Sequence, residues 1–507
     1  MTKILRAGRL SGTALALVLG GAMLAAPAMA DTLKMAWATD ATGLDPHKQT
    51  AFTSLRLLEL IYEPLVRLNA DLEIVPALAT SWEFNAEGTQ LTFKLAEAAQ
   101  FQDGAKLTSA DVKASFERLL DEATAAAGRA NFLSIASIDT PDDHTVVFHL
   151  SQPDVPILAA MASANASIVS KAAIEAGTVE TQPNGSGPFK LASREPNQKT
   201  ELVAFEGWAG GKAGVDGVTI STLPDESAIL AALRAGQVDF AMINDPLIAT
   251  LVPDEKGLVL TRTPSINYRA LQLNASRGAM TELKVRQAIS CAVDRQEIID
   301  LASEGEGRVV GPMTVPAYAN PVEDLFCYTP DLEKAKALMA EAGHADGFEA
   351  TVIASNGSAA TASAEAQVLQ EQLAKIGIKL DIKMMELNVY VDAWLAGDFD
   401  MAVALNGGRS DPYPMYNRYW TKAGNLQKVA QYIDDELDSL MAQGRVETDP
   451  AKRVEIFKAL EKHLTEVSPW IWTYAAFNYT AQSEKVQGFE PNPTGALYTL
   501  SNVTLAN

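Results

Sequence analysis

The strongest constraint on the fold is an alternation of short apolar strands with longer amphipathic helices after Asn274. Helices are predicted at 284–301, 332–342, 362–376 and 434–445, and strands at 350–353, 379–383 and 401–405. Shorter strands before Asn274 are predicted at 32–37, 89–95 and 145–150. Helices that alternate with strands cover the faces of a sheet, and 507 residues exceed what one core usually supports. The pattern therefore predicts an α/β protein with two lobes that meet near Asn274.

The first 30 residues have the features of an export signal. A basic stretch, Met1–Arg9, precedes an apolar stretch, Leu10–Leu24, and an A-x-A cleavage motif that ends at Ala30. The apolar run is shorter than the roughly 20 residues that a membrane-spanning helix needs. No later segment has 18 consecutive apolar residues. We therefore expect cleavage after Ala30 and a soluble protein in the periplasm.

The charge of the chain excludes two classes of partner. It has 41 Lys and Arg against 63 Asp and Glu, which gives a net charge of −22. Phosphate backbones and anionic membrane surfaces both require a concentrated basic surface. We therefore expect no nucleic-acid partner and no docking on a membrane by charge alone.

The sequence has no motif for catalysis, metal binding or a cofactor. The five histidines are scattered, and H-E-x-x-H, G-x-S-x-G and phosphate-loop patterns are absent. The two cysteines, Cys291 and Cys327, are equally compatible with a disulfide and with free thiols. We expect a binding protein that is not an enzyme and needs no metal or cofactor. The alternative from another class is an extracytoplasmic hydrolase with an unrecognised carboxylate pair.

A series of local blocks distributed over residues 31–507 identifies a family. The blocks are Leu44–Pro46, Leu60–Leu65, Pro76–Glu83, Leu91–Leu95, Phe101–Gly104, Leu107–Ser115, Gly185–Phe189, Val285–Ile289 with Ala292–Arg295, and Lys334–Lys336 with Glu341–Gly343. Together they resemble family 5 of the extracytoplasmic solute-binding proteins, the receptors of peptide-type ABC importers for dipeptides, oligopeptides, glutathione and nickel chelates.

The resemblance implies a two-lobed periplasmic-binding-protein fold with a hinge. The implied first lobe comprises 31–70, 186–273 and 478–507, an extra subdomain comprises 71–185, and the second lobe comprises 274–477. It further implies a monomer that captures a small peptide or peptide-like solute between the lobes and delivers it to an ABC permease in the inner membrane. An oligosaccharide or opine-like solute is the alternative ligand, and a chemosensory role on the same scaffold is not distinguished from transport.

The principal candidate site follows the strand at 401–405. The segment Asn406–Tyr413 contains Asn406, Gly408, Arg409, Asp411 and Tyr413, and ligands of α/β lobes bind beyond the carboxyl ends of strands. Glycine lets the backbone approach a ligand, and Arg409 offers a planar fork of donors. In peptide-binding members of the family an Asp at the position that matches Asp411 pairs with the ligand's α-ammonium group. The resemblance therefore implies that role for Asp411.

Further candidates are Thr50, Phe52, Asn244, Asn356 and Trp394. Thr50 and Phe52 resemble the segment that lies along the peptide backbone in this family, whereas Asn244 and Asn356 follow predicted strands. Trp394 is a candidate aromatic wall, although a helical tryptophan more often packs in a core. The region of Asn356 lacks the arginine that dipeptide receptors can place for a ligand carboxylate. A free C-terminus would then need one of three bases, which are Arg56, Arg269 and Arg409.

Overall fold

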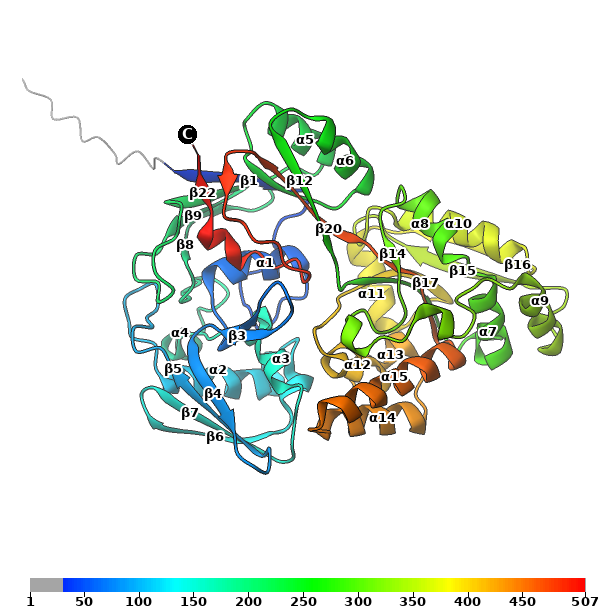
Figure 1. The fold of residues 1–507 in the computed structure, drawn as a ribbon, viewed down its shortest axis with the longest axis horizontal. Coiled ribbons are helices and arrows are strands. Elements are labelled where there is room, and N and C mark those ends of the chain that lie inside the picture. Colours follow the sequence, from blue (N-terminus) through cyan, green and yellow to red (C-terminus); the bar gives the residue numbers. More distant parts are fainter. Residues whose placement is uncertain (1–30, 507) are drawn as a thin grey trace, which may run out of the picture.

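The computed structural model describes residues 31–506 and has two bodies that lie side by side (Figure 1). The expected export signal and its cleavage after Ala30 lie outside the described residues. No helix among residues 31–506 is long and apolar enough to cross a membrane.

The first lobe is built on a seven-stranded mixed sheet. Its strands are, in order, β12 (Leu258–Pro264), β20 (Phe477–Ser483), β11 (Phe240–Ile243), β1 (Thr32–Trp37), β10 (Gly217–Thr222), β9 (Lys199–Ala204) and β8 (Phe189–Glu195). Only β1 pairs in parallel, with β10 and β11. Its helices are α1 (Phe52–Ile61), α5 (Glu226–Arg234) and α6 (Pro246–Leu251), and two short strand pairs flank it, β2 (Val66–Leu68) with β3 (Ile74–Pro76) and β21 (Val486–Gln487) with β22 (Thr504–Leu505).

A subdomain inserted into the first lobe has its own antiparallel sheet. The strand order is β4 (Ala79–Phe84), β5 (Gln90–Leu95), β7 (Thr145–Leu150) and β6 (Ile135–Asp142). Its helices are α2 (Ser109–Leu120), α3 (Ile157–Met161) and α4 (Lys171–Ala176). Apolar residues on alternate positions of β5 are buried in a cluster that is separate from the core of the first lobe.

The second lobe has a five-stranded sheet between helices (Figure 1). The strand order is β16 (Ile378–Met384), β15 (Phe348–Ala354), β17 (Met401–Asn406), β13 (Tyr268–Leu273) and β18 (Trp470–Trp472). The helices are α7 (Leu283–Ala292), α8 (Arg295–Ala302), α9 (Leu332–Glu341), α10 (Ala362–Ala374), α11 (Leu387–Ala396), α12 (Pro412–Trp420), α13 (Gln427–Ala430), α14 (Asp435–Val446) and α15 (Pro450–Val467). Two short strands, β14 (Arg308–Val309) and β19 (Tyr474–Ala475), pair beside the sheet.

The structure corrects two expectations about this half of the chain. The predicted boundary at Asn274 is wrong, because β13 pairs with β17 and β18 inside the second lobe, and the chain crosses between the lobes at 265–267. The predicted helix 284–301 is two helices, because Asp294 accepts hydrogen bonds from the backbone of Gln296 and Glu297 and starts a new helix.

The second crossing between the lobes lies next to the first. The backbone N–H of Ser265 donates to the carbonyl of Ala476, which precedes β20. The cysteine pair left open by the sequence is a disulfide between Cys291 and Cys327, within the second lobe.

Candidate ligand-binding site

A cavity lies where the first lobe, the subdomain and the second lobe meet. Its walls come from α1 and residues 494–498 of the first lobe, from residues 159–165 of the subdomain, and from Asn267 and the loop 408–410 after β17. The full lining is Phe52, Leu55, Arg56, Glu59, Tyr62, Pro64, Arg67, Leu68, Ala159, Ala162, Ser163, Ala164, Asn165, Asn267, Gly408, Arg409, Ser410, Thr494, Gly495, Ala496 and Tyr498. The site is therefore interlobe, and lobe closure can enclose a ligand in it.

Helix α1 divides its residues between the core and the cavity. Its buried apolar positions, which include Leu57, Leu58 and Ile61, pack in the core of the first lobe. Phe52, Arg56 and Glu59 line the cavity, because residues three or four positions apart lie on one helix face.

Two arginines present their charge to this cavity from opposite lobes. Arg56 donates from Nε to the carbonyl of Gly495 at 3.0 Å, and Arg409 follows β17 in the second lobe. Among the described side chains, no carboxylate lies within 4.0 Å of a nitrogen of either guanidinium. Burial lowers the pKa of each arginine to about 10, with the like charge of Arg418 adding to the effect at Arg409. Both side chains therefore remain cationic at neutral pH.

Glu59 is the one acid among the described residues that line the cavity. Its Oε2 accepts a hydrogen bond from the backbone N–H of Leu497 at 3.1 Å. Burial raises the pKa of Glu59 to about 7, against the effects of the Leu497 N–H, Arg56 and Arg67. The neighbouring Arg67 is paired with Glu63 at 2.6 Å. The cavity thus contains one carboxyl group beside two cations that have no protein carboxylate.

The structure places Asp411 in an ion pair outside the cavity wall. Its two oxygens accept hydrogen bonds from both terminal nitrogens of Arg453 on α15, at 2.6 and 2.8 Å, and Oδ1 also accepts from the N–H of Tyr413 at the start of α12. Asp411 is 6% exposed and is not a wall of the cavity. Its charge is already compensated by Arg453, so a contact with a ligand's ammonium group stays a prediction that this geometry does not favour.

The other residues of the predicted segment divide between the cavity and the core. Gly408 and Arg409 line the cavity, whereas Asn406 and Tyr413 are buried away from it. Gly408 also donates its N–H to Asn267, so the loop is attached to the crossing segment.

The weaker candidates are dispersed, except for Phe52. Phe52 lines the cavity, but Thr50 on the same segment is exposed and does not. Asn244 is bonded to Glu226, Asn356 accepts from the N–H of Ser363, and Trp394 donates to Gln272 at 2.6 Å. Of the three bases considered for a ligand carboxylate, Arg269 is paired with Glu365, which leaves Arg56 and Arg409.

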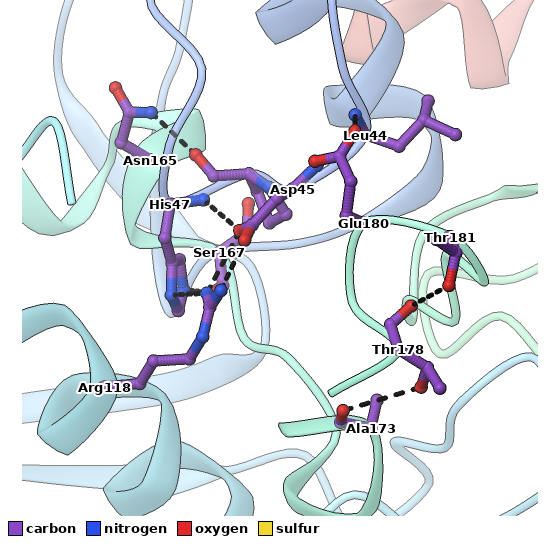
Figure 2. A network of polar contacts seen from close by, with 11 residues as sticks. Leu44, Asp45, His47, Arg118, Asn165, Ser167, Ala173, Thr178, Glu180 and Thr181 are labelled. Carbon is purple, nitrogen blue, oxygen red and sulfur yellow. Dashed lines mark hydrogen bonds and ion pairs between the residues drawn. The ribbon is translucent and has the colours of Figure 1, made fainter. Parts of the chain in front are cut away.

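A polar network holds the loop that precedes α1 (Figure 2). Arg118 on α2 donates to both carboxylate oxygens of Asp45 and lies 2.8 Å from Nδ1 of His47. His47 Nε2 lies 3.0 Å from the carbonyl of Ser167, and burial lowers the pKa of His47 to about 4. Asn165, which lines the cavity, donates to the carbonyl of Pro46 at 2.7 Å. The network therefore attaches the subdomain wall to the first lobe.

Direct contacts also join the second lobe to the subdomain. Arg445 on α14 donates to Asp154 at 2.6 Å, and its carbonyl accepts from the N–H of Val155 at 3.0 Å. Asn417 on α12 donates to Asn131 at 3.2 Å. These contacts hold the two lobes together beside the cavity.

Comparisons with known proteins agree with this architecture. The profile of bacterial extracellular solute-binding proteins, family 5 (middle), matches residues 73–427. The glutathione-binding protein GsiB of Escherichia coli K12 is 27% identical over 471 residues, which cover 88% of this chain and 90% of GsiB.

Solved structures superpose over nearly the whole chain. The binding protein AgaA of A. tumefaciens R10 in complex with agropinic acid is 29% identical, with a TM-score of 0.84 over 94% of this chain and 99% of AgaA. The periplasmic binding protein DppA of Helicobacter pylori in complex with the peptide STSA is 26% identical, with a TM-score of 0.82 over 94% of this chain and 98% of DppA.

Proposed function

Because the chain belongs to family 5 of the bacterial extracellular solute-binding proteins, we propose that it is the importer receptor for a carboxylate-bearing solute, peptide-like or opine-like. One observation carries the choice of ligand: Arg56 and Arg409 face the interlobe cavity without a carboxylate partner among the described side chains. A desolvated guanidinium forms strong bidentate hydrogen bonds with a carboxylate. An acid bound between them would join one residue of each lobe and so favour closure.

The comparisons support an acid. GsiB binds glutathione, AgaA binds agropinic acid and DppA binds the peptide STSA. An oligosaccharide is a poorer fit, because an uncharged ligand would leave two half-buried cations without counter-charge.

The proposed mechanism consists of binding, closure and delivery, with no bond chemistry. We assign the first lobe to 31–70, 186–264 and 477–507, the subdomain to 71–185 and the second lobe to 268–474, with rotation about the adjacent crossings at 265–267 and 475–476. Export with cleavage after Ala30, a periplasmic monomer and an inner-membrane ABC permease as partner complete the proposal.

Calorimetry with glutathione, agropinic acid, the peptide STSA and a neutral oligosaccharide tests this function. Arg409→Gln should weaken binding of the preferred acid by at least tenfold. The same substitution should raise the melting temperature of the ligand-free protein, because it removes a desolvated cation near Arg418. Arg277→Gln, which alters an exposed ion pair with Asp398, is the matched control. Equal affinity of Arg409→Gln and wild type, or a preference for the oligosaccharide, would refute the proposal.

A further inference from the structure

We propose that Glu59 accepts the ammonium group of the ligand, so that the receptor selects amino-acid-derived acids with two carboxylates and one ammonium group. This inference rests on the proposed function and narrows its ligand class. Glu59 would take the role that the family resemblance gave to Asp411.

The free oxygen of Glu59 is open to the cavity. Oε2 is occupied by the N–H of Leu497, whereas Oε1 accepts from no described residue. Oε1 has no partner among the described residues and yet is not a fully buried atom. It is therefore accessible within the cavity that Glu59 lines. An ammonium group of a bound ligand can therefore reach this oxygen without displacing a protein contact.

No cation of the described protein side chains neutralises Glu59 by direct contact. Arg56, one turn earlier on α1, donates to Gly495, and Arg67 on the adjacent β2 is paired with Glu63. Neither guanidinium lies within 4.0 Å of a Glu59 oxygen. The raised pKa of Glu59, about 7, reflects this desolvation, and an incoming cation would restore the charged form.

The charges of the cavity specify the ligand. Arg56 and Arg409 supply two cations without a protein carboxylate, and Glu59 supplies one anion. A buried ligand is favoured when each of its charges is compensated. The complement is a molecule with two carboxylates and one ammonium group, such as a γ-glutamyl peptide or an N-substituted glutamate.

Two probes that differ only at the ammonium group provide the test. Glutathione has two carboxylates and one ammonium group, and its glutaryl analogue carries hydrogen in place of that ammonium. Calorimetry at pH 8, where Glu59 is ionised, should show that wild type binds glutathione at least tenfold more tightly than the analogue. Glu59→Gln should abolish this preference, because glutamine has nearly the shape of glutamate but lacks its negative charge. Melting temperature and circular dichroism verify that the variant is folded.

A second pair of ligands provides the same test if the receptor does not bind glutathione because of its shape. Mannopinic acid is an N-substituted glutamate, and its lactam, agropinic acid, lacks the ammonium group and one carboxylate. Wild type should prefer mannopinic acid, and Glu59→Gln should lose that preference.

The outcomes separate the two proposals. If wild type binds both members of each pair equally while Arg409→Gln weakens all of them, Glu59 has no such role and the acid-binding function stands. If Glu59→Gln still prefers the ammonium-bearing member of each pair, the inference about Glu59 is also wrong and the acid-binding function stands. If wild type binds none of the four acids, the inferred ligand class fails, and the proposed function fails with it only if wild type does not bind the peptide STSA either.

Discussion

Arg453 on α15 donates from both terminal nitrogens to the two carboxylate oxygens of Asp411, at 2.6 and 2.8 Å. The carboxylate also accepts from the N–H of Tyr413 and so caps α12. The pair therefore fixes the end of the loop that presents Arg409 to the cavity. Asp411 itself is not part of the cavity wall.

Asp411→Asn should reduce stability more than affinity. The substitution leaves the buried guanidinium of Arg453 without a counter-charge, which costs roughly 3 kcal/mol. Chemical denaturation should show this loss, and the double variant Asp411→Asn/Arg453→Met should recover part of it. A tenfold loss of affinity for an amine-bearing acid with unchanged stability would instead restore the direct ligand role of Asp411.

Gly408→Ala should impair ligand binding, whereas Gly407→Ala should not. A Cβ at Gly408 would lie 1.9 Å from the carbonyl oxygen of Ile266, a backbone atom that cannot move aside as the end of a flexible side chain can. A Cβ at Gly407 would have its nearest neighbour, Phe52 Cζ, at an ordinary 3.5 Å. We expect at least a tenfold loss of affinity for Gly408→Ala and less than twofold for Gly407→Ala by calorimetry. Similar affinities of the two variants would contradict this role of the loop.

Arg445→Gln should favour the open form of the receptor. It removes the contact with Asp154, whose side chain is 1% exposed when the lobes are together. When the lobes open, Asp154 is exposed to water. The substitution therefore destabilises the closed form and leaves the stability of the open form unchanged. Because Arg445 is partly exposed, we expect a modest effect, about tenfold faster ligand dissociation in stopped-flow measurements. Arg277→Gln serves again as control, and an unchanged dissociation rate would show that Arg445 does not stabilise closure.

The contribution of His47 to stability should fall as the pH falls from 6.5 towards 4, and Glu59, whose pKa burial raises to about 7, should act in the opposite direction. The pKa of His47 is about 4 in the folded protein against 6.5 for an ordinary histidine. Between these values the unfolded chain binds a proton that the folded protein does not, so stability is retained above pH 6.5 and lost below it. The contribution is at most about 3 kcal/mol.

Denaturation at pH 7.5, 6.5, 5.5 and 4.5 measures this contribution. The stability of His47→Gln relative to wild type should rise as the pH falls, whereas that of His149→Gln, at an exposed pair with Asp139, should not change. Parallel curves for all three proteins would exclude His47 as a source of the pH dependence.

Sequence patterns predicted those helices and strands that are determined by residues close to them in the sequence. The strands β1, β15, β16 and β17 were recognised because an apolar run bounded by turn residues needs no knowledge of the rest of the fold. The boundary at Asn274 was wrong for the same reason, because the partners of β13 lie more than 100 residues away in β17 and β18.

Part of the cavity lining was named from the sequence, for a related physical reason. Gly408, Arg409 and Phe52 were named from sequence and line the cavity, and Arg56 was named as a possible base. Glu59, which also lines the cavity, was not named, although its spacing from Arg56 on α1 was a usable signal. The partner of Asp411 is 42 residues away on a helix that was not predicted, so its charge seemed free.

The position of β20 determines when the first lobe can be completed during synthesis. This strand lies between β11 and β12, so a nascent chain that ends before Phe477 leaves both strands without their shared neighbour. Pairing of such distant segments is slow, because a long loop must close before any contact forms. The proposed export of the chain in an extended state would gain from this delay, since the first lobe stays incomplete until β20 has been made.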